Sequence, residues 1–511
     1  MFDRPFSLPA WAELIMGAAI VLFLNSAWSI WKLRHIPTVG GPALPLFSYI
    51  GTFRYLQNRQ GLLQEGYDQY KNHPGLFKIA APDHWIVVVA HLNLIDELQK
   101  HSDENVSFMA AGAEIVGMRY ITPRSLADDP WHIPPLKQHL THSISSFFGD
   151  MVDELRVSIE ESLETTNEVD GWISVAPLQT FFWVFTRVVN RLFVGLPIGR
   201  DPRFVQLMLD FTTSVSAARF WTGLVPPGLK PAVALFAAHR ARKAAGEAEK
   251  MLAPVIAERV RNLDEYGDKW TERPNDLLQI VLEAALAGGH TLDEVAIRTI
   301  AMIFVGASTS AMSFVHVLYH LAADPRLHAA LRAEADGALA RDGWTKHALA
   351  RMPRVDAVLR ESQRFNGINA FSMMRATLRP VTLTSAGTPL ALPAGTLCVA
   401  PQRALHGDGA LHDEPHIFAP FRALDAPGGA KPEQLVRTST RYVPFGHGKH
   451  ACPGRFFAGN EMKAAVAHVV TTYDVKLPGG ATARPPNEIL GLTIAPNRSA
   501  KVMFRRRQPA A

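Results

Sequence analysis

The sequence is organised around residues 441–458, which read R-Y-V-P-F-G-H-G-K-H-A-C-P-G-R-F-F-A. Cys452 stands between a glycine-rich loop and the beginning of an apolar pattern with helical spacing. Gly446, Gly448 and Gly454 permit backbone geometries that other residues cannot adopt, so the loop can lie against a flat ligand. Because a helix N-terminus lowers the pKa of a nearby thiol, this position is predicted to favour the Cys452 thiolate.

A lone thiolate beside space for a planar ligand is the chemistry that an axial ligand of haem iron requires. The alternative is a buried thiol next to a turn, because free cysteine is among the most buried residue types. Cys398 is the second of two cysteines, and a disulfide between them would consume the proposed ligand. The cysteine content therefore fits a reducing compartment. Pro453 is suited to the first turn of the following helix.

The order of these residues resembles the haem-binding signature of the cytochrome P450 family, F-x-x-G-x-R-x-C-x-G. The matching positions are Phe445, Gly448, His450, Cys452 and Gly454. His450 stands where the family usually has arginine, and a histidine can also contact a haem propionate, with pH dependence. The resemblance implies that haem b (iron protoporphyrin IX) binds here with Cys452 as its axial ligand. Phe445, Gly446 and Gly454 would form the loop against it.

A second motif, V-G-A-S-T-S at residues 305–310, resembles the oxygen-binding motif A-G-x-D-T-T of the same family. The resemblance implies that Gly306 allows the helix to approach bound oxygen. It further implies that Thr309, with Ser308 and water, delivers protons. Ser308 stands where an acid is usual, and a serine can relay a proton but supplies no charge. The alternative is that both hydroxyls simply bond to the preceding helical turn.

A third motif places Glu361 and Arg364 on one face of a predicted helix, where they can pair. An exposed pair of this kind is common and contributes little to stability. The motif resembles the E-x-x-R of the family, and F-A-P-F-R at residues 418–422 resembles its F-x-P-x-R. The resemblance implies that Glu361, Arg364 and Arg422 together lock the core below the haem, a structural role.

Two further positions are implied by the resemblance to contact the haem propionates, namely Arg375 and Trp131. The family's W-x-x-x-R pattern departs here, because Pro135 stands at the arginine position. Lys137 or His132 could take the place of that arginine.

The element pattern predicts a mainly α protein with small β-sheets (α+β), which agrees with the cytochrome P450 fold. A capping box at Thr291 and Glu294 predicts the start of a long buried helix. Residues 101–129 lack periodicity and are expected to form a loop over the haem. The predicted helices are 62–70, 92–100, 131–148, 154–164, 178–196, 204–220, 237–266, 291–321, 355–365 and a last one ending near 471. The predicted strands are 76–79, 85–90, 373–375, 381–392, 396–400, 473–477 and 493–504.

An apolar run at residues 11–31 is long enough to span a hydrocarbon core of roughly 30 Å. Trp11, Trp28 and Trp31 suit the two interfaces, and basic residues follow directly at Lys32 and Arg34. A signal peptide is the rival interpretation, but no small-residue cleavage motif follows. The predicted domains are an anchor at 1–35, a proline- and glycine-rich hinge at 36–46 and one catalytic domain at 47–511. The protein would be a single-pass protein of the endoplasmic reticulum membrane, with its catalytic domain in the cytosol.

The net charge of +5 is mild and shows no long basic run, so nucleic acid is not expected as a partner. Basic residues do gather near the cysteine motif, either as a solvated face or as a docking surface for an acidic electron donor. They are Arg437, Arg441, Lys449 and Arg455. The sequence contains no nicotinamide- or flavin-binding fingerprint, so electrons would come from an NADPH–cytochrome reductase.

The resemblance implies a haem-thiolate monooxygenase that uses O2 to oxidise an apolar small molecule. The style of the cysteine loop, H-A-C-P-G-R-F-F-A, is similar to that of filamentous-fungal members, which suggests a secondary metabolite such as a terpenoid. Two alternatives stay open. One is a haem-thiolate isomerase or dehydratase, and the other is a haem-binding membrane protein without turnover.

Overall fold

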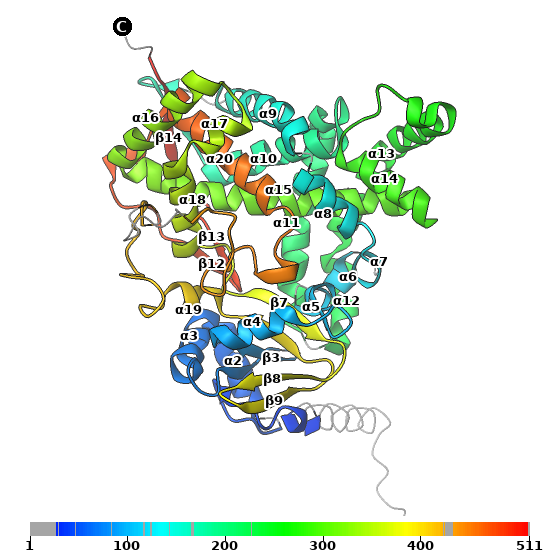
Figure 1. Ribbon diagram of the computed structural model, residues 1–511, viewed down its shortest axis with the longest axis vertical. Coiled ribbons are helices and arrows are strands. Elements are labelled where there is room, and N and C mark those ends of the chain that lie inside the picture. Colours follow the sequence, from blue (N-terminus) through cyan, green and yellow to red (C-terminus); the bar gives the residue numbers. More distant parts are fainter. Residues whose placement is uncertain are drawn as a thin grey trace, which may run out of the picture.

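The computed structural model describes residues 27–508 apart from 29, 46, 83, 116–117, 123–124, 143, 165–167, 226, 423 and 425–432. Figure 1 shows a part rich in strands at one end of the molecule and a larger helical part at the other. The long helix α15 (Leu292–Ala323) crosses the helical part. Most of the predicted membrane anchor lies outside the described residues.

The largest sheet joins segments that are far apart in the sequence. Its six strands are ordered β1 (Thr38–Val39), β2 (Leu76–Ala80), β3 (Trp85–Val89), β10 (Leu397–Ala400), β7 (Ser372–Thr377) and β4 (Val106–Ser107). β2 and β3 form an antiparallel hairpin, and β10 runs parallel to β3. β7 pairs antiparallel with β10 so that Arg375 lies opposite Cys398. The sheet therefore fixes the position of a buried arginine.

Short helices cover this sheet, and one of them begins at a clear cap. They are α2 (Ser48–Gln57), α3 (Arg59–Tyr70), α4 (Leu92–Lys100) and α19 (Gln402–His406). Asn58 precedes α3, and its side-chain oxygen accepts a hydrogen bond from the backbone N–H of Gly61 at 2.9 Å. Leu62, Leu63 and Tyr67 form the buried face of α3. The β8 (Val381–Ser385) and β9 (Thr388–Leu392) hairpin extends beside α4.

α15 is the centre of the helical part. It packs along α10 (Pro177–Val194), where Phe314 lies 4.5 Å from Phe181 and 5.6 Å from Phe185 between ring centres. Among the residues described, α15 is the single helix with the length and apolarity to cross a membrane, and 67% of its most apolar window is buried. It is therefore a core helix of this fold, as the histidines within it predicted.

The remaining elements surround α10 and α15 or connect them to the sheet. The longer helices are α8 (Ile133–His142), α9 (Ile144–Glu164), α11 (Pro202–Thr222), α12 (Lys230–Ala237), α13 (His239–Tyr266), α14 (Leu277–Gly288), α16 (Pro325–Asp342), α18 (Pro353–Phe365) and α20 (Arg455–Thr472), and the shorter ones are α5 (Phe108–Ile115), α6 (Met118–Ile121), α7 (Ser125–Asp128) and α17 (Lys346–Ala350). The smaller sheets contain β11 (Tyr473–Lys476), β14 (Val502–Arg506), β6 (Trp172–Val175) and β5 (Glu168–Val169), and separately β12 (Glu488–Leu490) with β13 (Thr493–Ala495).

The predicted fold class, mainly helical with small sheets, is confirmed. Three local predictions are wrong. The segment 101–129 contains β4, α5, α6 and α7 rather than a loop without regular structure. The strand predicted at 493–504 is two strands in two different sheets. The capping box at Thr291 does not form, because its side chain makes no cap hydrogen bond and Glu294 contacts Trp131 instead.

Candidate active site

The cysteine loop is held by its own backbone. The N–H of Cys452 donates to the carbonyl of Phe445 at 2.7 Å, and the N–H of Gly446 donates to Val443 at 3.0 Å. Gly446 has φ +68, a conformation that favours glycine. α20 begins at Arg455, so Pro453 precedes the helix rather than occupying its first turn. The loop therefore presents the thiol immediately before the helix.

The Cys452 thiol has a higher pKa than the sequence predicted. Burial raises it above the usual value for a thiol, and the N–H groups of Gly454 and Arg455 lower it by less. The helix N-terminus thus acts in the expected direction, but burial outweighs it, and the predicted net lowering is wrong. A metal ion that coordinates a thiol deprotonates it outright, so the buried Cys452 suits a metal-bound thiolate.

Arg375 and His450 form a buried polar group near this loop. Arg375 is almost fully buried, and its Nη1 donates to the carbonyl of Met374 at 2.8 Å. Its Nε and Nη2 atoms have no hydrogen-bond partner among the described residues. His450 Nε2 lies 2.6 Å from Asp103 Oδ1. Burial lowers the pKa of His450, and the positive charges of Arg375 and Lys137 lower it further.

These unpartnered atoms test whether a haem fits the chain. Two buried guanidinium nitrogens without an acceptor suit a carboxylate, since carboxylates bind arginine through two parallel hydrogen bonds. A haem propionate is such a carboxylate. The buried lone thiol and the unsaturated Arg375 together fit this group.

Trp131 is bound to α15, and no recorded contact joins it to Arg375 or His450. Its indole N–H donates to Glu294 at 3.4 Å, its ring stacks on His290 at 4.4 Å, and the Arg298 guanidinium lies 4.6 Å from the ring centre. His132 lies 2.9 Å from Arg298 through Nδ1, and its buried Nε2 has no hydrogen-bond partner. His132, one of the two residues suggested in place of the missing arginine, therefore keeps a free ring nitrogen.

The hydroxyls of α15 bond to the preceding turn. Thr309 Oγ1 donates to Val305 O at 2.9 Å, and Ser308 Oγ donates to Phe304 O at 2.7 Å. Val305 is 46% exposed although α15 is a core helix, and Thr309 lies one turn further on the same face. Ser308 is buried. The structure therefore places Thr309 on the open face of α15 and Ser308 on another.

Gly306 faces α10. A Cβ at this position would lie 3.5 Å from Val189 and 3.8 Å from Phe193, which is ordinary contact. Its side-chain direction therefore does not point to the face of Thr309, and its predicted role beside bound oxygen stays a prediction.

A buried acid that the sequence analysis missed lies on α20. Glu461 is fully buried, and neither carboxyl oxygen has a hydrogen-bond partner of good geometry among the described residues. Burial raises the pKa of Glu461 to about 8, while the nearby Ser310 hydroxyl lowers it slightly. The available signal was an acid within the otherwise apolar run of a helix, nine residues after Cys452.

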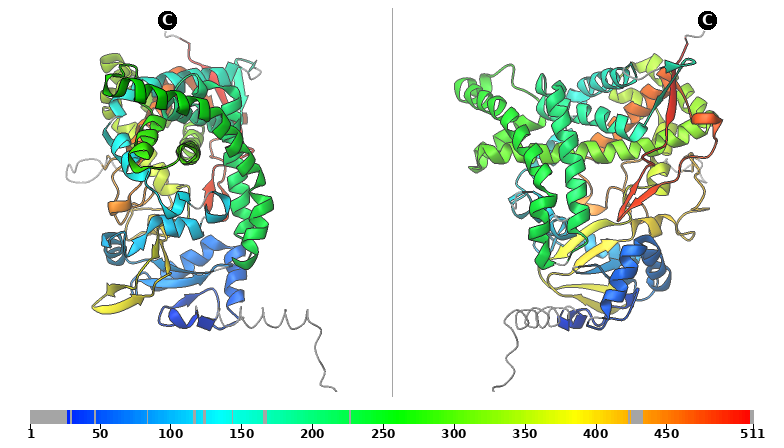
Figure 2. Two further views of the ribbon diagram at one scale, coloured as in Figure 1. Left: turned by 90° about the vertical axis from the view of Figure 1, so that its right-hand side faces the viewer. Right: turned by 180° about the vertical axis from the view of Figure 1, so that it is seen from behind.

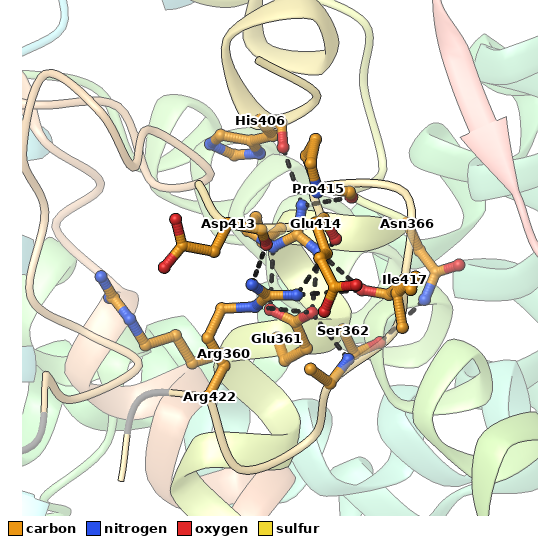
Figure 3. Close-up of polar contacts among 12 residues, drawn as sticks. Arg360, Glu361, Ser362, Asn366, His406, Asp413, Glu414, Pro415, Ile417 and Arg422 are labelled. Carbon is orange, nitrogen blue, oxygen red and sulfur yellow. Dashed lines mark hydrogen bonds and ion pairs between the residues drawn. The ribbon is translucent and has the colours of Figure 1, made fainter. Parts of the chain in front are cut away.

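Glu361 is the centre of a saturated network (Figure 3). It accepts from Arg364 Nε at 2.8 Å and Nη2 at 2.7 Å, and Arg422 Nε approaches it at 3.4 Å. Arg364 Nη1 also donates to the carbonyls of His406 and Pro415, at 2.7 and 2.8 Å. The side chains of Glu361 and Arg364 are 5% and 4% exposed, so the alternative of an exposed pair is wrong. The three residues of the predicted lock do lie together.

The most prominent hollow lies elsewhere. It is lined by residues of α3, α18 and α19, among them Tyr67, Lys71, Arg364 and Asp408. Tyr67 and Lys71 donate to Asp408 at 2.8 and 2.7 Å, so its polar groups already bond to one another. Its lining includes neither Cys452 nor Thr309, so the chemistry is assigned to the cysteine loop and α15.

Comparisons with known proteins agree with this geometry. The description "Cytochrome P450" belongs to the family that matches residues 39–502. Cytochrome P450 monooxygenase 103 of Postia placenta is 38% identical over 499 residues, covering 96% of this chain and 98% of the relative. Cytochrome P450 monooxygenase CYP512U6 of Ganoderma lucidum is 33% identical, covering 96% and 95%. Cytochrome P450 monooxygenase AN1598 of Emericella nidulans is 29% identical, covering 99% and 94%.

Proposed function

The chain belongs to the cytochrome P450 family of haem-iron monooxygenases, oxidoreductases that incorporate oxygen from O2, and we propose that it oxidises an apolar fungal secondary metabolite such as a terpenoid. The observation that carries the proposal is the buried, unpaired thiol of Cys452 in its glycine-rich loop. The relatives from Postia, Ganoderma and Emericella support a fungal member of the family.

We propose haem b as the cofactor, held by residues of the loop and the sheet. Cys452 would ligate the iron, and Arg375 with His450 would bind propionates through the nitrogen atoms described above. Phe445 and Gly446 would let the loop lie flat against the ring. When bound, a thiolate-ligated haem iron activates O2 and favours cleavage of the O–O bond.

Thr309 is the proposed proton relay. Its Oγ1 donates to Val305 and keeps lone pairs that can accept a hydrogen bond from water on the open face of α15. Ser308 would assist only through water, and it carries no charge. Glu461 is a buried acid whose pKa of about 8 keeps it protonated at neutral pH, and it borders α15 at Ser310. It therefore offers a proton reserve where the family motif has its acid replaced by Ser308.

Electrons would reach the site from an NADPH–cytochrome reductase. Arg437, Arg441 and Lys449 are exposed near the cysteine loop, and complementary charge steers the encounter with an acidic partner. Residues 1–35 would anchor the chain in the endoplasmic reticulum membrane, through a hinge at 36–46, with the catalytic domain in the cytosol.

Reconstitution with a fungal NADPH–cytochrome reductase tests the proposal. The purified full chain is incubated with NADPH, ¹⁸O2 and a panel of terpenoid hydrocarbons and alcohols. We expect products that carry one ¹⁸O atom and form only with NADPH, and a lower product-to-NADPH ratio in Thr309→Ala. Product formed without NADPH would favour an isomerase or dehydratase. NADPH consumption and product both absent in haem-loaded protein would favour a haem-binding protein without turnover.

A further inference from the structure

Two arginines lie where the end of α11 meets the sheet part of the molecule. In Figure 2, α11 and α12 extend from the helical part down to the part that contains the large sheet. Arg219 is in the last turn of α11, and Arg59 is the first residue of α3. The two residues are 160 positions apart in the sequence, and the fold brings them to one place.

Arg59 is held on two sides and has unused hydrogen-bonding capacity. Its guanidinium lies 4.9 Å from the centre of the Tyr55 ring. A Cβ at Gly491 would come within 2.4 Å of Arg59 Nη1, so the guanidinium rests directly on the turn between β12 and β13. The Nε atom of Arg59 is buried and has no hydrogen-bond partner.

Arg219 adds a second positive charge beside the first. The side chain is partly buried, and burial is the main cause that lowers its pKa. The charge of Arg59 lowers that pKa further, whereas Tyr55 raises it. The two guanidiniums are therefore close enough to repel each other. Within the described part of the chain, neither of them has a carboxylate at ion-pair distance.

Other buried arginines of this chain do have such a partner. Arg259 contacts Asp276 at 2.6 Å, and Arg187 contacts Glu154 at 2.6 Å. Two like charges in a partly buried site destabilise the protein unless an anion lies between them, since screening by water is weak there. A carboxylate could accept hydrogen bonds from both guanidiniums, and charge-assisted bonds of this kind are about twice as strong as neutral ones.

The pair adjoins an apolar surface that continues toward the proposed active site. Ile489 and Leu490 of β12 are 49% and 45% exposed, next to the turn that Arg59 contacts. Beyond that turn, the carbonyl of Leu492 accepts from the N–H of Ala370 at 2.8 Å. Ala370 precedes β7, which carries Arg375. A ligand here would have its polar end at the arginines and its apolar body along β12.

We propose that Arg59 and Arg219 bind the carboxylate of the substrate, so that the enzyme acts on apolar carboxylic acids and orients them by their acid end. This inference rests on the proposed function and narrows its substrate class. It assigns a binding role to two residues that lie outside every motif of the sequence analysis.

Binding of acids and their methyl esters tests the inference. Decanoic acid, hexadecanoic acid and abietic acid are each compared with the corresponding methyl ester, by calorimetry on the haem-loaded full chain in detergent. We expect at least one acid to bind about tenfold or more tightly than its ester, because charge-assisted hydrogen bonds are lost in the ester. That preference should largely disappear in Arg59→Gln and in Arg219→Gln, and Arg219→Lys should retain part of it.

Arg54→Gln is the matched control. It removes the same charge from the same surface, but Arg54 is half exposed and paired with Glu65 at 2.9 Å. Its acid preference should equal that of the unmodified protein. Acids that bind no more tightly than their esters to the unmodified protein would overturn the inference, whatever the variants do.

Two further readouts separate the possible failures. The carbon-monoxide difference spectrum is recorded on the same samples, so loss of thiolate-ligated haem would count against the proposed function, and its presence without acid preference counts against the inference alone. Binding to phosphatidylglycerol vesicles that weakens in both variants, with no acid preference, would assign the pair to a lipid headgroup and would overturn the substrate role.

Discussion

Two arginine sites of this protein differ in what surrounds them. Arg364 is buried and uses its Nε and both terminal nitrogens on Glu361 and on backbone carbonyls of the segment 406–417. Arg219 and Arg59 lie together with no carboxylate, and one buried Nε has no partner. The first site is complete within the chain and supports the fold. The second has bonding capacity that only a ligand can use.

Arg375 belongs to the second kind. Its Nε and Nη2 atoms are buried without a partner, and burial lowers its pKa to about 10. A cation that is disfavoured by its surroundings persists when a bound anion compensates for it. Unsatisfied buried cations therefore distinguish the ligand-binding parts of this molecule from its structural parts, and substitutions can test that distinction.

The largest effect is expected at the complete site. Glu361→Gln leaves the Arg364 charge buried without its counter-ion, and breaking a buried pair costs about 3–5 kcal/mol of folding free energy. Urea unfolding followed by circular dichroism measures the loss. Glu65→Gln removes an acid from the half-exposed pair with Arg54 and should leave the unfolding midpoint unchanged. Equal effects of the two substitutions would break the comparison.

Glu461 should make stability depend on pH. Its folded pKa of about 8 lies above the ordinary value of 4.5 that the unfolded chain has, so the folded protein binds the proton more tightly. Its contribution to stability is fully present below about pH 4.5 and is lost as the pH rises toward 8, by about 1.4 kcal/mol for each pH unit. Glu461→Gln has no such proton. Its unfolding free energy should therefore rise relative to the unmodified protein between pH 5 and pH 8, and parallel pH profiles would refute this assignment.

A smaller and opposite pair of effects is expected at Arg375. Arg375→Gln removes an uncompensated buried cation, so the haem-free protein should melt at a higher temperature. The same substitution removes propionate contacts, so haem should dissociate roughly tenfold faster. Thermal melting and haem transfer to apomyoglobin measure the two effects. A lower melting temperature of the haem-free variant would mean that Arg375 is a structural residue like Arg364.

The sequence predicted the parts of the site that are local. The cysteine loop, the hydroxyls at 308–309 and the Glu361–Arg364 pair are each set by residues within one turn or loop, and their residue types limit what they can form. Partners from distant segments could not be predicted. Arg59 meets Arg219 through the packing of α11 on the sheet part, and Trp131 bonds to Glu294, which had been assigned to a cap.

Burial is the second reason for the differences. The helix N-terminus predicted a low pKa for Cys452, but the depth of the thiol is a property of the whole fold and reverses the sign. The same holds for Glu461, whose residue type is plain in the sequence and whose isolation from hydrogen-bond donors is not.

The carbon-monoxide difference spectrum of the reduced full chain, measured beside Cys452→Ser, tests the central claim most directly. The account predicts a red-shifted Soret band in the unmodified protein that is lost in Cys452→Ser, while circular dichroism shows the same fold in both. The absence of that band in folded, haem-supplemented protein, or its persistence in Cys452→Ser, would contradict the assignment of Cys452 as the haem ligand.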